Sequence, residues 1–576
     1  MNVSTASAMI TTGRVELANI RQKTLATAKD RVPVVVLLFV LFTLACFVRI
    51  AQLGIFEQGP RTANMADALL PPRGEIVDRN GVPLARAFPA YALWFNPKAF
   101  GASGGSALVK TPEEVADALI RIFPDADRAD LIRRLKSDKP SYLRRRILPE
   151  EANRIHALGE PALEFPRENQ RFYPQGSLAA HVLGYVDAEG QGHVGMEQVL
   201  NQQLSDPAMR GIPAVLSIDM RVQGALEDEL NRGMLESNAK GAAGIIVDVD
   251  TGEVIALASL PSFNPNRSDM AFNDLVFNKV TNQVYELGST FKPLTVAAAI
   301  DAGTVTSMAR RYPSGAPLQI GGFSIRDSHN LGESLNVPEA LIHSSNIVTA
   351  QIADQLGGAA LRQTMMALGM NQRPFIELPA RGFPLWPGKD WARITTMTVS
   401  YGHGIAVTPL HLAAAYAAMV NGGIWRPTTL LKVAPGKEAQ GRRVFKASTS
   451  ARMRQLLRMI VVDGTGKTAN APGFRVGGKT GSAEKPGVRG YNRTSLVSTF
   501  AAAFPMDRPR YVIISMLDEP QGTVATSYQR TAAFNAAPII GRVVPRIGPL
   551  LGIVPDENRD VDISDLSPLV GNGDGE

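Results

Sequence analysis

The sequence predicts an α+β protein with one transmembrane helix, an elongated N-terminal region and a large C-terminal domain. Three observations predict it. Residues 32–48 form an apolar run without a charge; residues 51–239 mix short helix-like and strand-like segments; and residues 240–554 place strand-like runs at both ends and helical patterns between them. The last arrangement is typical of an antiparallel sheet flanked by helices, with a helical insert.

The N-terminal segment predicts a single membrane crossing. Residues 1–31 are polar and carry more basic than acidic side chains, and Val32–Val48 would span about 25 Å as a helix, slightly less than a hydrocarbon core of roughly 30 Å. Further apolar residues extend the helix to residue 50. The basic side comes first, so residues 1–31 should be cytoplasmic and the rest external. A buried core helix or a cleaved signal is the alternative, but the flanking charges and the lack of an A-x-A site argue against them.

Composition narrows the class of protein. The chain has 576 residues, of which 45% are hydrophobic and 20% charged, as in ordinary globular proteins. Its net charge of +7 comes from scattered basic residues that are not interleaved with aromatics, so we expect no nucleic-acid partner. The single cysteine, Cys46, excludes an intramolecular disulfide, and the seven histidines lack metal-ligand spacing. We therefore expect no metal and no other cofactor.

The region 51–239 contains turn signals rather than catalytic patterns. Asp78-Arg79-Asn80-Gly81 predicts a tight turn, and residues 112–157 predict small helices. Further glycine-containing stretches occur at 171–176, 181–185 and 195–197, where we expect His181 to make a structural contact. Residues 212–220 predict a strand, and residues 221–234 a connecting helix.

The C-terminal domain should begin near Lys240. Two apolar runs, 244–249 and 253–258, surround Asp250-Thr251-Gly252 and predict a β-hairpin. Beyond it we expect helices after Lys292 and at 337–343, strands at 474–478, 496–503 and 511–517, and a loop at 486–493. His403 lies in a Gly-flanked loop, which favours packing over catalysis. The acidic residues 555–576 predict a disordered tail.

The pair Ser289 and Lys292 is the first motif that carries chemistry. Residues three apart share one face of a helix, and a serine hydroxyl needs a base within hydrogen-bond reach to act as a nucleophile. Lys292 can be this base if burial or a neighbouring cation lowers its pKa. Alone, S-x-x-K is weak, because a helix-capping serine followed by a solvated lysine gives the same pattern.

Two further motifs follow in the chain and turn the pattern into a family resemblance. They are Ser344-Ser345-Asn346 and Lys479-Thr480-Gly481-Ser482. The order S-x-x-K, S-x-N, K-T-G resembles the penicillin-recognising serine enzymes. Arg73-Gly74 with the turn at 78–81, and the stretches between 171 and 197, are similar to the two pedestal signatures of class B penicillin-binding proteins. The resemblance covers nearly the whole chain and implies the penicillin-recognising transpeptidase fold.

The resemblance also implies a role for each site residue. Ser289 attacks the D-Ala–D-Ala carbonyl of a peptidoglycan stem peptide, and Lys292 accepts its proton. Ser344 relays a proton to the leaving amine, Asn346 bonds Lys292 or the substrate amide, and Lys479 is a fixed positive charge. Thr480, Gly481 and Ser482 bind the substrate carboxylate, with the backbone N–H groups of Ser289 and Ser482 as the oxyanion hole. Leu287 and Ser482 replace the proline and threonine of many relatives.

The predicted organisation is a cytoplasmic tail (1–31), a transmembrane helix (32–50), a pedestal (51–239), a transpeptidase domain (240–554) and a tail (555–576). Length, a single anchor and the lack of a C-terminal extension resemble the division-specific septal type, in the bacterial inner membrane at the division site with a periplasmic catalytic domain. Expected partners are nascent stem peptides, β-lactams, a polytopic glycan-polymerising membrane protein and other division proteins. An elongation-type transpeptidase, a β-lactamase or β-lactam sensor, and a division scaffold with dispensable chemistry are the alternatives.

Overall fold

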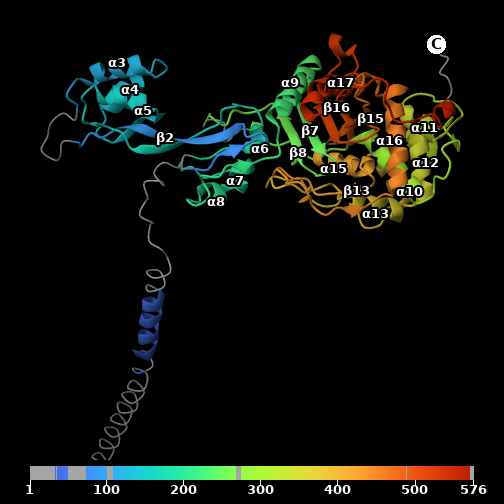
Figure 1. Ribbon diagram of the computed structural model, residues 1–576, viewed down its shortest axis with the longest axis horizontal. Helices are drawn as coiled ribbons and strands as arrows, with labels where there is room; N and C mark the ends of the chain where they lie inside the picture. Colours follow the sequence, from blue (N-terminus) through green and yellow to red (C-terminus); the bar gives the residue numbers. More distant parts are fainter. Residues whose placement is uncertain are drawn as a thin grey trace, which may run out of the picture. The chain divides into compact units, whose positions relative to one another are not determined.

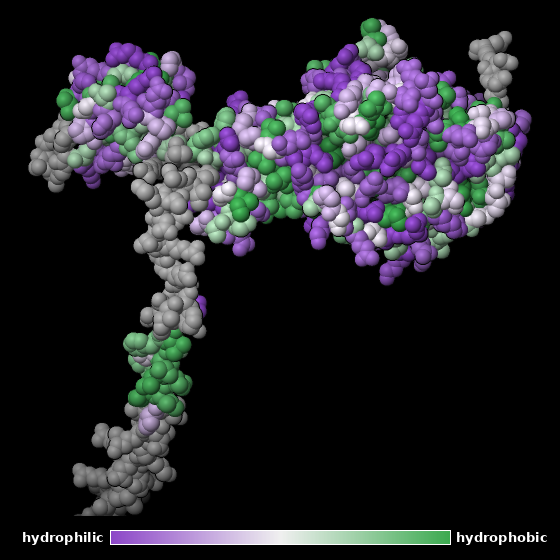
Figure 2. Space-filling model, viewed as in Figure 1, coloured by the Kyte–Doolittle hydropathy of each residue, from purple (hydrophilic) through white to green (hydrophobic). Residues whose placement is uncertain are grey.

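The computed structural model describes residues 33, 36–49, 73–99, 108–187, 189–267, 274–487 and 490–570. The chain divides into two compact units, residues 1–70 and 71–576. The predictions for residues 1–31 and for the connector 51–70 lie outside the described residues. In the first unit, residues 36–49 are helical, and their large apolar side chains are exposed (Figure 2). Among the residues described, no helix has the length and apolar character needed to cross a membrane.

The pedestal is built around one long strand (Figure 1). Strand β2 (Pro83–Phe95) pairs antiparallel with β1 (Ile76–Val77), β3 (Ser141–Ile147), β4 (Leu163–Glu164) and β5 (Arg167–Phe172), and β1 pairs parallel with β6 (Ala214–Val215). The predicted small helices are α3 (Pro112–Ile122), α4 (Arg128–Leu135) and α5 (Pro149–His156), which enclose their own apolar core with β2 and β3. Helix α3 begins at a capping box between Thr111 and Glu114.

A buried group of charges joins the two pedestal signatures. The carboxylate of Glu197, in α7 (Gly195–Val199), is fully buried and accepts from Arg73 Nε at 2.9 Å and from Arg171 Nε at 2.6 Å. The two guanidinium groups also donate to the carbonyls of Glu197 and Gly74. His181, in α6 (Ala180–Leu183), makes a structural contact, because its Nε2 lies 2.7 Å from the carbonyl oxygen of Leu275 and burial lowers its pKa to about 4.

The second domain contains a five-stranded antiparallel sheet in the order β15-β16-β17-β7-β8. Its strands are β15 (Gly477–Gly487), β16 (Gly490–Phe504), β17 (Tyr511–Asp518), β7 (Gly241–Asp248) and β8 (Val254–Leu260). Helices α9 (Met220–Glu236) and α17 (Ala536–Ile547) pack on one face, and α15 (Pro409–Val420) and α16 (Ala447–Val462) on the other. Alternate residues of β7 serve the two faces: Ile246 faces α9, whereas Ile245 and Val247 belong to the opposite core.

The remaining helices form the insert. They are α10 (Lys292–Asp301), α11 (Val337–Ile342), α12 (Asn346–Leu356), α13 (Gly358–Ala367) and α14 (Arg393–Val399), and they lie together away from α9 and α17 (Figure 1). Short strand pairs, β9 (Tyr312–Pro313) with β12 (Ser334–Leu335) and β10 (Leu318–Ile320) with β11 (Phe323–Ile325), connect α10 to α11. The fold class predicted from the sequence is confirmed for this domain and the pedestal.

Three local predictions are wrong. Residues 212–220 hold only the two-residue strand β6, and α9 packs against β7, β8 and α17, so it belongs to the second domain and not to the pedestal. The loop expected at 486–493 is mostly strand, because β15 and β16 continue their pairing to Gly487 and Gly490. The proline and glycines of this stretch suggested a loop, but a two-stranded hairpin tip accommodates them.

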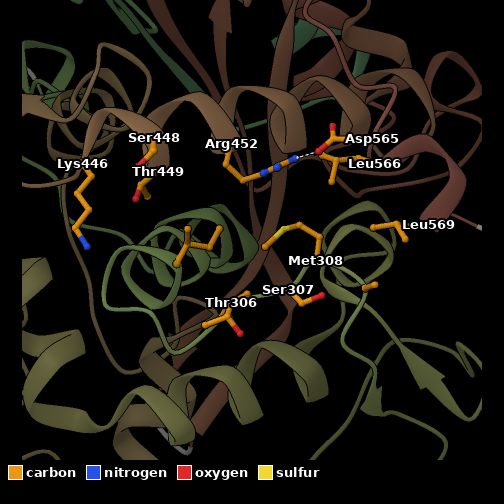
Figure 3. Close-up of a pocket in the computed structure, with 13 residues that line it drawn as sticks. Thr306, Ser307, Met308, Lys446, Ser448, Thr449, Arg452, Asp565, Leu566 and Leu569 are labelled. Atoms are coloured by element: carbon orange, nitrogen blue, oxygen red, sulfur yellow. Dashed lines mark hydrogen bonds and ion pairs between the residues drawn. The ribbon is translucent and has the colours of Figure 1, made fainter.

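The predicted disordered tail is also wrong for residues 555–570. Leu566 is buried in the main core, Asp560 pairs with Arg458, and Asp565 pairs with Arg452, because the acidic residues of the tail meet basic side chains of α16. Arg452, Met308, Leu566 and Leu569 are among the side chains that line a cavity of about 520 Å³ between the tail, α16 and the end of α10 (Figure 3). The Nδ2 of Asn336, at the start of α11, donates to the carbonyl of Leu569. Residues 571–576 lie outside the described part.

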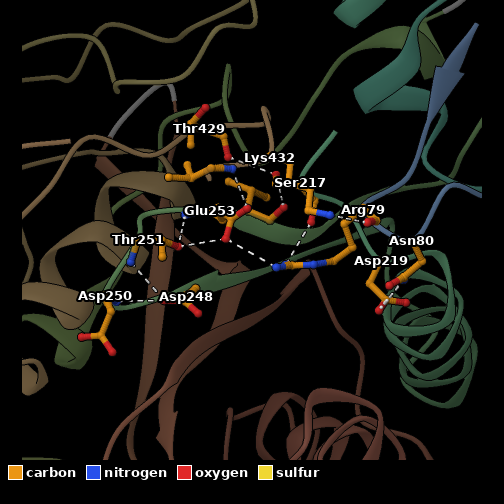
Figure 4. A network of polar contacts seen from close by, with 12 residues as sticks. Arg79, Asn80, Ser217, Asp219, Asp248, Asp250, Thr251, Glu253, Thr429 and Lys432 are labelled. Atoms are coloured by element: carbon orange, nitrogen blue, oxygen red, sulfur yellow. Dashed lines mark hydrogen bonds and ion pairs between the residues drawn. The ribbon is translucent and has the colours of Figure 1, made fainter. Parts of the chain in front are cut away.

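The turn at residues 78–81 fastens the pedestal to the second domain (Figure 4). Arg79 Nη1 donates to the carbonyl of Ser217 at 3.3 Å and its Nη2 lies 3.5 Å from Glu253 Oε2, while Lys432 Nζ donates to the carbonyl of Arg79 at 2.9 Å. Asn80 Nδ2 donates to Asp219 Oδ2 at 3.0 Å. The first pedestal signature is therefore a junction between domains.

Candidate active site

Ser289 and Lys292 lie on a turn pressed against strand β15. Ser289 belongs to a 3₁₀ turn, η3 (Gly288–Phe291), and Lys292 begins α10. Gly288 has φ +55°, and a Cβ there would lie 3.0 Å from the carbonyl oxygen of Ser482, so glycine allows both the conformation and the approach. The buried hydroxyl of Tyr416 donates to the carbonyl of Thr290 at 2.8 Å and supports the turn from α15.

The three motifs meet at the hydroxyl of Ser344. This residue lies between α11 and α12 and has a left-handed backbone, with φ +62°. Lys292 Nζ donates to its carbonyl oxygen and, at 3.0 Å, to its Oγ; Lys479 Nζ donates to the same Oγ at 2.9 Å. The Oγ of Ser289, which is half-buried, has no hydrogen-bond partner among the described residues. Ser344 Oγ therefore connects the amines of Lys292 and Lys479.

Burial changes the acid–base properties of both lysines. Each side chain is 0% exposed. Burial, and secondarily the charge of Lys479, lowers the pKa of Lys292 well below its usual value, although Asp327 opposes this shift. Burial alone lowers the pKa of Lys479 to about 7. The pKa of each lysine therefore lies below its usual value, and the role of Lys479 as a fixed positive charge stays a prediction.

Asn346 is held by the insert rather than by Lys292. Its Nδ2 donates to the carbonyl of Arg326 at 2.9 Å, and its backbone N–H donates to Asp327 Oδ1 at 2.5 Å. Asp327 also accepts from Ser345 Oγ at 2.7 Å, so this carboxylate fixes the start of α12. Within the described residues the side chain of Asn346 makes no bond to Lys292, which leaves the substrate amide as its expected partner. Asp327 has no predicted role from its sequence pattern, and only its position before α11 could have drawn attention to it.

Lys479, Thr480, Gly481 and Ser482 lie along β15 beside the turn. A Cβ at Gly481 would lie 2.4 Å from the carbonyl oxygen of Leu287, so only glycine lets the strand come this close. Thr480 Oγ1 lies 3.2 Å from Lys479 Nζ and 2.8 Å from Thr465 Oγ1. Ser482 Oγ accepts the N–H of Ala532 at 3.1 Å and keeps its own proton free to donate.

His403 packs, as the sequence predicts, but it does so beside the nucleophile turn. Its Nδ1 lies 3.3 Å from Glu286 Oε2, and its ring contacts those of Tyr401 and Tyr491. Glu286 and Tyr491 received no role from the sequence, because their contact joins segments about two hundred residues apart.

The fold and the site define a serine enzyme of the acyl-transfer type, and comparisons with known proteins place it in a family. Residues 242–539 match the family described as penicillin binding protein transpeptidase domain, and residues 68–211 match the penicillin-binding protein dimerisation domain. The chain therefore belongs to the penicillin-binding proteins that carry a transpeptidase domain.

Individual relatives span almost the whole chain. It is 38% identical to a probable peptidoglycan D,D-transpeptidase FtsI of Caulobacter vibrioides, over 94% of this chain and 92% of the relative. It is 30% identical to the peptidoglycan D,D-transpeptidase FtsI of Escherichia coli, over 87% and 88%. Penicillin binding protein 3 of Mycobacterium tuberculosis, solved with ampicillin, has the same fold, with a TM-score of 0.67, 24% identity and coverage of 86% and 99%.

Proposed function

We propose that this chain is a peptidoglycan D,D-transpeptidase that crosslinks stem peptides at the division septum through an acyl-enzyme on Ser289. The observation that carries the assignment is the pair of buried lysines that share the hydroxyl of Ser344. Acyl transfer needs a base that can take up the proton of the serine, and burial lowers the pKa of Lys292 in the direction that favours its neutral form. The similarity to FtsI proteins supports the septal role.

The first half of the reaction forms the acyl-enzyme. Ser289 Oγ attacks the penultimate D-Ala carbonyl while Lys292 Nζ takes its proton, and the N–H groups of Ser289 and Ser482 bind the oxyanion. When the tetrahedral intermediate collapses, the C–N bond breaks and the terminal D-Ala leaves as an amine. Its proton arrives from Lys292 through Ser344 Oγ, which lies 3.0 Å from that lysine. An amine of a second stem peptide then attacks the ester and forms the crosslink.

Lys479 acts on the carboxylate of the donor peptide. Thr480 and Ser482 present hydroxyls along β15, and Lys479 lies behind them at 3.2 Å from Thr480 Oγ1. With a pKa near 7, Lys479 becomes protonated more completely when the anionic substrate binds, because a nearby negative charge favours the charged form. Asn346 Oδ1 faces no partner within the described residues and can accept from the substrate amide.

The membrane arrangement is part of the proposal. Residues 32–50 cross the inner membrane once, with residues 1–31 in the cytoplasm and the two domains in the periplasm. The apolar run without charges supports this, as do the exposed apolar side chains of residues 36–49. We further propose that this segment pairs with a polytopic glycan-polymerising protein of the division complex. Exchange of Val32–Val48 for an unrelated transmembrane helix should retain penicillin binding and abolish division.

Labelling with a fluorescent penicillin tests the assignment. The wild-type chain should form a stable adduct, because the β-lactam carbonyl reacts as the D-Ala–D-Ala carbonyl does. Ser289→Ala should form none, and it should fail to replace the wild type in a depletion strain. Ser448→Ala, an exposed serine on α16, is the control and should label fully. An adduct on Ser289→Ala would place the nucleophile elsewhere.

A further inference from the structure

The carboxylate of Glu286 collects three contacts beside the active site. Tyr491 Oη donates to it and lies 3.0 Å from each of its two oxygens. The N–H of Gly404 donates to Oε1 at 3.0 Å, and His403 Nδ1 lies 3.3 Å from Oε2. The side chain of Glu286 is only 10% exposed, although it lies just three residues before Ser289. The proposed acyl-transfer mechanism gives no role to this group.

The contacts come from two separate segments that both touch the site. Tyr491 follows Gly490 at the start of β16, and β16 pairs with β15, the strand that carries Lys479 and Ser482. His403 and Gly404 belong to the loop after α14. A Cβ at Gly402 in this loop would lie 2.2 Å from the carbonyl oxygen of Gly288, so the loop rests on the nucleophile turn. Glu286 thus connects the turn, the loop and the end of the hairpin.

The chemistry of these groups favours a durable contact. Partial burial, with the neighbouring charge of Glu286, raises the pKa of Tyr491 to about 12, so its hydroxyl remains a donor at any physiological pH. Hydrogen bonds from a hydroxyl to a carboxylate are stronger than those between neutral groups. The ring of His403 lies edge-on to Tyr491, at 5.6 Å between centroids, and limits where the tyrosine can move.

The hairpin is attached to the nucleophile segment at two places. Near the site, β15 lies on the turn at Gly481 and Ser482. The register then carries the hairpin onward, and Tyr491 is paired with Pro486, four residues beyond Ser482. On this stretch Lys485 Nζ donates to Asp518 Oδ1 at 2.8 Å and to Glu519 Oε1 at 2.9 Å, which ties the ribbon toward β17 and not toward the Ser289 turn. The hydrogen bond from Tyr491 to Glu286 connects the far part of the hairpin to the segment that carries Ser289.

We propose that Glu286 is a positioning residue that ties the end of the β15–β16 hairpin to the Ser289 turn and so fixes the spacing of the Ser289 and Ser482 N–H groups during acylation. This inference rests on the proposed function. Glu286 acts through geometry rather than through its field, because the pKa of Lys292 responds to Lys479 and Asp327 and not to Glu286. The expected effect is therefore on the acylation step and not on the initial binding of the β-lactam.

The test compares two tyrosines of the same cluster. Tyr491→Phe removes the hydroxyl that reaches Glu286 and keeps the ring, whereas Tyr401→Phe removes a hydroxyl that bonds to none of the described residues. In the full-length chain, stopped-flow acylation with a fluorescent penicillin separates the dissociation constant from the acylation rate constant. We expect Tyr491→Phe to lower the rate constant by about tenfold, with the dissociation constant within about twofold. Tyr401→Phe should change neither by more than about twofold.

A second pair of variants distinguishes geometry from charge. Glu286→Gln keeps an oxygen that accepts from Tyr491 and should acylate within about tenfold of wild type, whereas Glu286→Ala should lose about a hundredfold. Equal rates for the two tyrosine variants, or equal losses for Gln and Ala, would overturn the positioning role. So would a loss that appears only in the dissociation constant. If the wild type itself forms no adduct, the proposed function fails instead, which the labelling of Ser289 decides separately.

Discussion

The pedestal and the transpeptidase domain each bury a cluster of charges, and the two clusters are built in opposite ways. In the pedestal, the carboxylate of Glu197 lies between Arg73 and Arg171, with bonds of 2.9 and 2.6 Å. In the active site, Lys292 and Lys479 share only the neutral hydroxyl of Ser344. The first cluster pairs a carboxylate with two cations, whereas in the second cluster burial lowers the pKa of both lysines. Burial therefore gives rigidity in one domain and reactivity in the other.

We expect the largest effect when Lys292 is replaced by a residue that cannot release its proton. Lys292→Arg replaces an amine that can act as a base by a permanent cation, because a guanidinium does not lose its proton at any relevant pH. We expect acylation by penicillin to slow by at least about a thousandfold, or roughly 4 kcal/mol of barrier. Acylation within about tenfold of wild type would show that another group is the base.

Breaking the pedestal cluster should affect stability instead. Glu197→Gln leaves two buried guanidinium groups without a counter-charge, so we expect the free energy of unfolding to fall by about 3 kcal/mol. Chemical denaturation of the pedestal measures this. The matched control is Glu75→Gln, which breaks the more exposed pair with Arg86 and should cost no more than about 1 kcal/mol. Equal losses would mean that burial of the pair contributes nothing.

Removal of the buried amine of Lys479 should raise the free energy of unfolding, whereas Glu197→Gln should lower it. Lys479→Met replaces a buried amine by an apolar chain of similar length, and we expect about 2 kcal/mol of added stability with loss of penicillin acylation. The gain should depend on pH. Between pH 10.5 and about 7 the unfolded chain holds a proton on Lys479 that the folded chain lacks, so the wild type loses stability as the pH falls through this range.

Denaturation at two pH values measures this dependence. The difference between Lys479→Met and the wild type should be greater at pH 7 than at pH 9.5, and it should level off below pH 7, where the folded protein also takes up the proton. A difference that is independent of pH would mean that Lys479 stays charged throughout.

We expect the smallest effect at the ion pair of Arg458 and Asp560, which is only partly buried. Arg458 is nearly buried, whereas Asp560 of the tail is well exposed, and their bond of 2.7 Å is accessible to water. Asp560→Asn should lower the free energy of unfolding by no more than about 1 kcal/mol. Unlike the other three changes, its effect should also shrink in 1 M salt, because the pair is screened.

The sequence predicts the two domains and the reacting side chains better than their surroundings. Ser289, Lys292, Ser344 and Lys479 stand in short motifs, and the structure brings them together. The nearby Asp327 and Glu286 are ordinary acidic residues in sequence, and they gain a role only through contacts with other segments, Asp327 with the start of α12 and Glu286 with Tyr491 and the loop after α14. The direction of the Lys292 pKa shift is foreseeable from burial, but the lowered pKa of Lys479 depends on the depth of β15 in the fold.

The local errors have physical causes. The stretch 486–493 contains proline and glycine, which favour a loop, yet pairing along β15 and β16 outweighs this preference. Residues 555–570 are acidic, which favours disorder in an isolated chain, yet the basic face of α16 provides partners for Asp560 and Asp565. In both segments, tertiary contacts that no sequence window contains decide the structure.

The ordered tail has a consequence for the timing of synthesis. Arg458, which pairs with Asp560, also donates to the carbonyl of Val476 just before β15, the strand that bears Lys479. Leu569 accepts from Asn336, which caps α11, the helix that leads to Ser344. A ribosome makes these tail residues after both of the elements that they support. A nascent or prematurely terminated chain thus lacks the tail contacts of both elements. The segments that carry Lys479 and Ser344 gain these contacts only when translation has reached residue 569.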